Sequence, residues 1–301
     1  MKIIIIGSEG FIGSHCVDHF LKGGHEVWGL DLFEQPSNPY RYIKVSRLSP
    51  EFEEIFRIVH FDAVVNAAGS GNVPYSMTHP LSDFEANCLD AIRILDVIHK
   101  YQQECKYIHL SSAAVYGNPA GLPIKEEDQT NPLSPYGYHK LISEQLCREY
   151  TSIFQLRTGI VRPFSVYGPG LKKQLFWDLY QKSIRASGNI ELHGTGKESR
   201  DYIHVRDLVR GIAAILDKGD LKGEVYNLAS GVETKIEEVV RIFFKALQIK
   251  REFHFNGNVR EGDPLNWRAN IGRIRQLGFT CQYDLNKGLE ELAGWARSLN
   301  S

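Results

Sequence analysis

The chain opens with the pattern that most limits its possible folds: an apolar strand, a glycine turn and an amphipathic helix. Residues 3–6 are four consecutive isoleucines, which is typical of a strand covered on both faces. Gly7, Gly10 and Gly13 follow, and an amphipathic stretch runs over 11–21. Glycines at such a turn let an anion approach the backbone N–H groups of a helix N-terminus. The opening therefore predicts a parallel sheet with a phosphate-binding turn.

Strand and helix patterns alternate through the first half of the chain, which is typical of a doubly wound parallel sheet. Strand-like runs lie at 25–31, 63–68, 106–111 and 154–162, helical patterns lie at 51–58, 81–101 and 135–150, and 32–50 has no regular pattern. Ser134 has the character of an N-cap, with Pro135 at the first helical position.

The pattern becomes looser after residue 165 and predicts a second, smaller unit. We expect a Rossmann-type α/β domain over 1–167, with return segments near 205–230, and a mainly substrate-binding domain over 168–301. Helical patterns in this half lie at 173–187, 205–217, 235–247, 270–277 and 285–298.

Composition excludes several classes of protein. Thirty-five Lys and Arg against 36 Asp and Glu leave a net charge of −1, so we expect no nucleic-acid partner. The opening apolar run of four residues is far shorter than the ~20 residues of a membrane span, and we find no signal-peptide pattern. Five scattered cysteines without a C-x-x-C pair predict neither a disulfide framework nor a metal site, and they favour the cytoplasm.

Asp31 adds a second sign of a nucleotide site. It ends the second predicted strand, 18 residues after Gly13. A carboxylate at this place can accept hydrogen bonds from ribose hydroxyls, and it repels a 2′-phosphate. No arginine occurs in residues 32–39, so the pattern favours NAD over NADP.

Tyr136 and Lys140 form a Y-x-x-x-K pattern on the predicted helix at 135–150. Residues four apart share a helical face, and a lysine one turn from a phenol is expected to lower the pKa of the phenol. Ser112 lies at the carboxyl end of a predicted strand, 24 residues before Tyr136. At this place its hydroxyl can bond the substrate oxygen that the phenol deprotonates. Tyr138 and His139 read as packing or surface residues. Each of these patterns is weak alone, but together with the glycine turn they are specific.

In this order the three patterns resemble the extended short-chain dehydrogenase/reductases, the NAD-dependent nucleotide-sugar epimerase/dehydratase family. The resemblance covers essentially the whole chain. Further segments similar to the family are Asn66-Ala67-Ala68-Gly69, Asn87, the run from Arg162 to Gly170, the run from Arg200 to Asp207, and Arg260-Glu261-Gly262-Asp263.

The resemblance implies a complete set of site residues. The implied catalytic residues are Ser112, Tyr136 and Lys140. The implied NAD contacts are Gly7, Gly10, Phe11, Ile12, Gly13, Asp31, Leu32, Ala67, Ala68, Gly69, Asn87, Tyr136, Lys140 and Pro163. The implied contacts to a nucleoside-diphosphate sugar are Ser112, Ser165, Arg200 and Arg260, and two arginines suit one diphosphate. A homodimer through the helices near 81–101 and 135–150 is also implied.

Departures from the family pattern guide the choice of reaction. Ala113 and Ala114 stand where the family's dehydratases carry Asp-Glu, so we do not expect 4,6-dehydration. We expect a C4-epimerase that exchanges hydride with NAD through a 4-keto intermediate. Ser165 replaces a family asparagine and favours the alternative, an NDP-4-keto-6-deoxysugar reductase that consumes NADH or NADPH. A non-catalytic NAD-binding regulator is the alternative from a different class.

Overall fold

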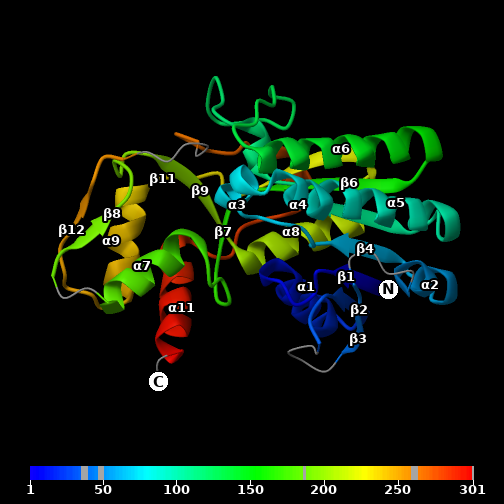
Figure 1. Ribbon diagram of the computed structural model, residues 1–301, viewed down its shortest axis with the longest axis horizontal. Helices are drawn as coiled ribbons and strands as arrows, with labels where there is room; N and C mark the ends of the chain where they lie inside the picture. The colour runs from blue at the N-terminus through cyan, green and yellow to red at the C-terminus, as the bar shows by residue number, and fades with distance from the viewer. Residues whose placement is uncertain (35–39, 47–50, 186–187, 259–263, 300–301) are drawn as a thin grey trace.

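A seven-stranded sheet lies at the centre of the computed structural model, which describes residues 1–34, 40–46, 51–185, 188–258 and 264–299. Its strands follow the order β10-β6-β5-β4-β1-β2-β3 and all pair in parallel (Figure 1). This confirms the predicted doubly wound α/β sheet. The strands are β1 (Lys2–Ile6), β2 (Glu26–Asp31), β3 (Arg41–Lys44), β4 (Ala63–Asn66), β5 (Lys106–Leu110), β6 (Arg157–Pro163) and β10 (Lys222–Leu228).

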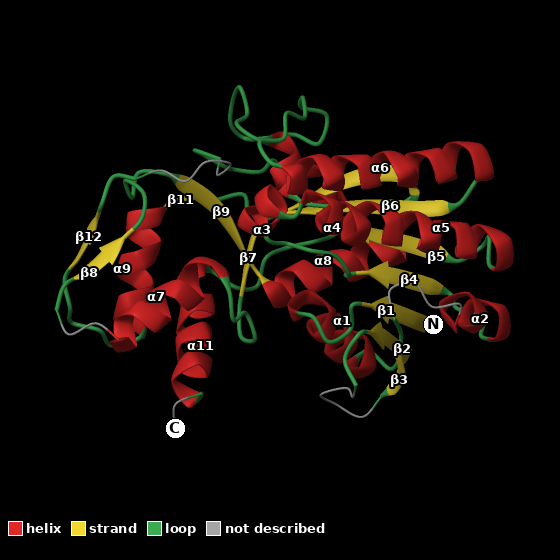
Figure 2. Cartoon of the chain, in the orientation of Figure 1, coloured by secondary structure: helices red, strands yellow, loops and turns green. Residues whose placement is uncertain are grey.

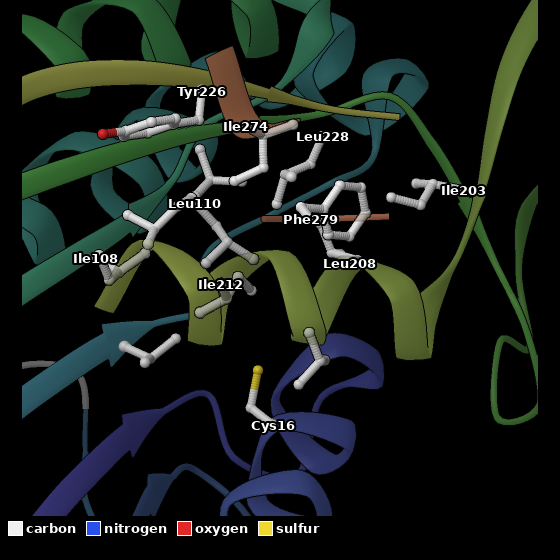
Figure 3. Close-up of a cluster of buried hydrophobic side chains, with 14 of the residues drawn as sticks. Cys16, Ile108, Leu110, Ile203, Leu208, Ile212, Tyr226, Leu228, Ile274 and Phe279 are labelled. Carbon is white, nitrogen blue, oxygen red and sulfur yellow. The ribbon is translucent and has the colours of Figure 1, made fainter. Parts of the chain in front are cut away.

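The four isoleucines of β1 are buried because helices cover both faces of the sheet (Figure 2). Ile3 and Ile5 belong to one apolar cluster with α1 (Phe11–Lys22) and α8 (Val205–Lys218), part of which is drawn in Figure 3. Ile4 and Ile6 belong to a second cluster with α2 (Glu51–Ile58), α5 (Asp90–Tyr101) and α6 (Pro135–Phe154). Alternate residues of a strand point to opposite faces, so an all-apolar strand needs two covered faces.

Three local features differ from the sequence prediction. The region expected to be irregular contains β3, a short strand that pairs with β2 at the edge of the sheet. The helix expected over 81–101 is divided into α4 (Pro80–Phe84), a π-helical turn (Glu85–Leu89) and α5, and it is preceded by α3 (Val73–Thr78). Helix α6 continues to Phe154, where the left-handed Gln155 (φ 62°) ends it, so β6 begins three residues later than expected.

A smaller lobe lies beside the large sheet (Figure 2). It has its own apolar cluster, which includes Tyr167, Phe176, Phe243 and Leu289. The division at residue 167 stays a prediction. The lobe contains a three-stranded sheet of β11 (Glu233–Lys235), β9 (Ser199–His204) and β7 (Ser165–Tyr167), a pair of β12 (Phe253–Phe255) and β8 (Ile190–Leu192), and the helices α7 (Gln174–Arg185), α9 (Ile236–Ala246) and α11 (Leu285–Ser298).

Two short elements pack against the large sheet. A 3-10 turn (Ala113–Tyr116) follows β5, and α10 (Gly272–Gln276) contributes Ile274 to the first apolar cluster. Among the described residues, we find no helix with the length and apolar character of a membrane span.

Candidate active site

The glycine turn between β1 and α1 is packed so closely that side chains do not fit. Gly7 has φ of +80°, and its N–H donates to the Leu30 carbonyl at 2.8 Å. A Cβ on Gly13 would overlap the Gly7 carbonyl oxygen, and a Cβ on Gly7 would lie 2.7 Å from the Ala68 nitrogen. Gly10 is the N-cap of α1 and makes no side-chain cap. The turn is therefore a bare backbone cradle of the kind that a pyrophosphate needs.

The first turn of α1 supplies the donors of this cradle. Phe11, Ile12 and Gly13 are its first three residues. The first N–H groups of a helix have no partner within the helix and carry a partial positive charge. Their place directly beyond the carboxyl end of β1 fits the two phosphates of NAD.

Asp31 ends β2 beside the glycine turn. Its Oδ2 accepts a hydrogen bond from the Glu9 N–H at 2.8 Å, and its Oδ1 accepts one from the Leu32 N–H at 2.7 Å. These two bonds fix the carboxylate. Each oxygen keeps lone-pair capacity for a ribose hydroxyl. The Asp31 carboxylate is therefore held in a place that fits the adenosine ribose of NAD.

The loop after β4 meets helix α6. Ala67, Ala68 and Gly69 follow β4, and Gly69 has φ of +122°. A Cβ on Gly69 would lie 2.6 Å from Asn87 Oδ1 and 3.4 Å from Lys140 Nζ. Asn87 Oδ1 is buried and has no hydrogen-bond partner among the described residues. Such an orphaned acceptor suits a donor from a bound cofactor.

Helix α6 presents Tyr136 and Lys140. Ser134 caps the helix by accepting a hydrogen bond from the Gly137 N–H at 3.2 Å, and the Tyr136 N–H donates to Ser76 Oγ at 3.1 Å. The Tyr136 phenol is hydrogen-bonded to the side chain of Ser112, which lies just beyond β5. Lys140 Nζ donates to the Leu110 carbonyl at 2.8 Å. The fold thus brings Ser112, Tyr136 and Lys140 together beyond the carboxyl end of β5.

Burial dominates the acid–base properties of this group. It raises the pKa of Tyr136 to about 12, although the hydrogen bond from Ser112 acts in the other direction. It lowers the pKa of Lys140 to about 8, and the carboxylate of Asp83 opposes this shift. The shift of Tyr136 is opposite to the one expected from the sequence. The reason is that the phenol is desolvated, while the lysine is committed to the Leu110 carbonyl.

The predicted substrate residues lie farther along the chain. Pro163 ends β6, and the partly buried Ser165 begins β7. Arg200 is on β9, where Nη1 donates to the carbonyls of Ser199 at 2.8 Å and Leu265 at 3.2 Å. Its guanidinium lies over the ring of Trp267, 5.6 Å from the centroid. Arg260 lies outside the described residues.

The sequence patterns did not predict two buried contacts at this site. His139 Nδ1 lies 2.7 Å from Oδ2 of Asp83, a fully buried residue of α4. This contact joins α4 to the turn of α6 that carries Tyr136 and Lys140. The spacing of Asp83 and Asn87, four residues apart, marks a common helical face, but nothing in the sequence pairs Asp83 with His139.

The second missed contact is a buried ion pair. Glu144 of α6 accepts hydrogen bonds from Arg162 Nε at 2.8 Å and Nη2 at 2.6 Å, and from Ser111 Oγ at 2.5 Å. Glu144 is fully buried, and Arg162 is 1% exposed. The pair joins α6, β6 and the end of β5, so it holds the supports of Tyr136 and Ser112 in one arrangement.

Comparisons with known proteins agree with this geometry. The chain is 28% identical to a putative UDP-glucose 4-epimerase of Methanocaldococcus jannaschii, over 99% of both chains. It is 32% identical to UDP-glucose 4-epimerase 2 of Arabidopsis thaliana, over 98% of this chain and 95% of that protein. The structure of UDP-glucuronic acid 4-epimerase from Bacillus cereus with UDP-glucuronic acid and NAD matches with a TM-score of 0.90 and 27% identity, over 99% and 100% of the two chains.

A family model matches most of the chain. The model is that of the NAD-dependent epimerase/dehydratase family, and it covers residues 3–229. This range contains the glycine turn, Asp31, Ser112, Tyr136 and Lys140. From this match and the whole-length similarity to the Arabidopsis protein, the chain belongs to the NAD-dependent epimerase/dehydratase family.

Proposed function

We propose that the protein is an NAD-dependent nucleoside-diphosphate-sugar 4-epimerase. The observation that carries this proposal is the bond between Ser112 and Tyr136, placed with Lys140 beside the backbone cradle for NAD. Relatives over the full length are named as UDP-sugar 4-epimerases. A nucleoside-diphosphate sugar is therefore the proposed substrate, and Ser165, Arg200 and Arg260 are its proposed further contacts.

The chain's own groups move one proton. Tyr136 accepts the proton of the C4 hydroxyl, and Ser112 bonds the same substrate oxygen. NAD, when bound, would supply the acceptor and donor of the C4 hydride, and the positive charge of its nicotinamide would favour the phenolate of Tyr136. Tyr136 would give its proton back to the C4 oxygen when the C4 carbonyl is reduced from its other face, which would give the epimer and leave NAD in its starting state.

The turn after Ser112 explains why the reaction stops at epimerisation. Ala113 and Ala114 begin the 3-10 turn that follows Ser112. Their methyl groups have no proton to give or take. Loss of water from the 4-keto sugar needs an acid and a base at this place, so dehydration is not supported.

Measuring the retained cofactor tests the proposal first. The protein is purified without added cofactor and denatured, and the released dinucleotide is quantified by chromatography and absorbance. Near-stoichiometric NAD is expected, because an epimerase regenerates its cofactor in each cycle. An empty site that binds NADH or NADPH weakly and reversibly would favour the 4-ketoreductase.

Substitution of Tyr136 tests the catalytic set. Tyr136→Phe should reduce 4-epimerisation of UDP-glucose by about a hundredfold or more, because the proton acceptor is lost, while bound NAD is retained. Tyr138→Phe is the matched control, since Tyr138 is on the same helix and 52% exposed. Unchanged turnover in Tyr136→Phe would contradict the mechanism and favour the non-catalytic regulator.

We also propose that the protein is a homodimer through α4 and α6. Leu81 and Phe84 on α4 and Tyr138 and Ile142 on α6 are exposed, at 70%, 38%, 52% and 40%. The two helices pack on each other, so these side chains offer an apolar face to a second copy. Light scattering at micromolar concentration should give the mass of two chains, and Leu81→Arg with Ile142→Arg should give one. A parent protein with the mass of one chain would refute this interface.

The proposed location is the cytoplasm. The five cysteines are free thiols, and Cys281 is exposed. Free thiols suit a reducing compartment.

A further inference from the structure

A second carboxylate, Glu9, lies at the glycine turn beside Asp31. Glu9 occupies the position before Gly10, and its N–H donates to Asp31 Oδ2 at 2.8 Å. Its side chain does not extend freely, because Oε1 accepts a hydrogen bond from the Tyr40 hydroxyl. The same hydroxyl lies 3.0 Å from Ser8 Oγ. The backbone of Glu9 is thus bonded to Asp31, and its carboxylate is held by Tyr40.

The position of Tyr40 depends on a glycine in the neighbouring strand. Tyr40 directly precedes β3, and Gly29 lies on β2. A Cβ on Gly29 would overlap the Tyr40 ring and lie 2.5 Å from Ser8 Oγ. Gly29 therefore makes the room in which Tyr40 reaches Glu9. Three separate segments combine to place this one carboxylate.

The charges around the turn are negative. Burial raises the pKa of Tyr42 to about 12, and the carboxylates of Asp31, Glu9 and Glu34 act in the same direction. The basic residues of β3 do not balance them, since Arg41 faces Glu26 at 3.4 Å and Lys44 is paired with Glu34. A second anion entering this corner would meet two fixed like charges.

We propose that Glu9, held by Tyr40, is a specificity-determining residue that acts with Asp31 to exclude dinucleotides carrying a 2′-phosphate. The proposal rests on the NAD-dependent function proposed above. Asp31 ends the strand where the adenosine ribose binds in this kind of sheet, and Glu9 is bonded to it. A 2′-hydroxyl can donate to these carboxylates, whereas a 2′-phosphate can only be repelled by them.

The test measures binding, so it does not depend on turnover. Dissociation constants of NADH and NADPH are measured by calorimetry on cofactor-stripped protein, for the parent and for Glu9→Gln. The amide keeps an acceptor for Tyr40 and removes only the charge. The Kd of NADPH relative to that of NADH should fall roughly tenfold, with the Kd of NADH nearly unchanged. An unchanged ratio would overturn the proposal.

Two further variants separate this effect from net charge and test the role of Tyr40. Glu34→Gln removes one carboxylate from the exposed pair with Lys44, and it should leave the ratio unchanged. Tyr40→Phe frees the Glu9 side chain without altering its charge. The Kd of NADPH relative to that of NADH should therefore also fall, but by less than in Glu9→Gln. An effect of Glu34→Gln as large as that of Glu9→Gln would refute a local role for Glu9.

The outcomes also distinguish this proposal from the proposed function. A parent protein that binds NADH but shows the same ratio in Glu9→Gln would overturn the role of Glu9 alone. A parent protein that binds neither dinucleotide would overturn the proposed function, and the role of Glu9 with it.

Discussion

Lys140 shows how one residue serves the site at a cost to the fold. It is 5% exposed, and Nζ has the Leu110 carbonyl as its acceptor. Burial lowers its pKa from 10.5 to about 8. The folded protein therefore carries a poorly solvated cation at neutral pH. A residue that destabilises the fold and belongs to the proposed catalytic set is expected where function and stability conflict.

Replacement of Lys140 should stabilise the cofactor-free protein in a pH-dependent way. Since the pKa is lowered on folding, the penalty is complete below pH 8 and disappears as the pH rises toward 10.5. Lys140→Met should raise the free energy of unfolding at pH 7, because it removes a penalty of at most about 3 kcal/mol. The lost bond to the Leu110 carbonyl offsets about 1 kcal/mol of this gain. Thermal unfolding of both proteins at pH 7 and pH 10 checks this. The same difference in Tm between the two proteins at pH 7 and at pH 10 would contradict this prediction.

At the scale of the element, α6 carries two of the proposed catalytic residues, and the N-terminus of the helix places them. Tyr136 is the second residue of the helix, so its place depends on how the chain enters the first turn. Ser134 caps that turn and is buried. The cap satisfies an N–H group that the helix itself leaves without a partner.

Loss of this cap should weaken the protein measurably. Ser134→Ala should lower the free energy of unfolding by about 1 kcal/mol, because the Gly137 N–H loses its acceptor. Urea titration followed by circular dichroism measures the change. Ser152→Ala, at an exposed hydroxyl near the other end of α6, is the control and should change stability by less than about 0.5 kcal/mol. Equal effects of the two substitutions would mean that the cap is not important.

At the scale of the whole molecule, Asp201 joins segments from both lobes. Its buried carboxylate accepts hydrogen bonds from the Ser230 N–H at 2.8 Å, the Gly231 N–H at 3.0 Å and the Ala269 N–H at 3.0 Å. Asp201 lies on β9 of the smaller lobe, while Ala269 packs in the apolar cluster of the large sheet. One side chain thus holds β9, with the adjacent Arg200, against the larger lobe.

Asp201→Asn should therefore affect both stability and substrate affinity. An amide group can accept at one atom only, so at least one of these buried N–H groups loses its partner, at a cost of about 1–3 kcal/mol. Loosening of β9 should also weaken binding of UDP through Arg200, with the bound NAD unchanged. Chemical denaturation and calorimetry with UDP measure the two effects. A stable variant that binds UDP normally would show that Asp201 does not position Arg200.

Much of the large sheet and its cofactor turn could be predicted because their signals are local. Four successive isoleucines require a strand covered on both faces, and Gly7, Gly10 and Gly13 mark a turn where a Cβ would overlap backbone. The predicted fold, family and use of NAD are confirmed. The assignment of individual site residues stays a prediction, although the fold brings Ser112, Tyr136 and Lys140 together.

The local signals failed where the element was short or its conformation depended on neighbours. Strand β3 has four residues and lies at the edge of the sheet, so it shows little apolar pattern. The π-helical turn Glu85–Leu89 keeps a helical periodicity in the sequence. A pattern of apolar residues does not distinguish such a turn from a continuous helix.

The sequence by itself determined most of the longer strands and helices and the place of the glycine turn, because dihedral preferences and periodicity act over a few residues. Tertiary structure alone decided the chemistry between distant residues. It desolvated Tyr136 and Lys140 enough to move their pKa values, and it paired Asp83 with His139 and Glu9 with Tyr40. These effects depend on desolvation and on distances between separate elements, and both exist only once the sheet order is set.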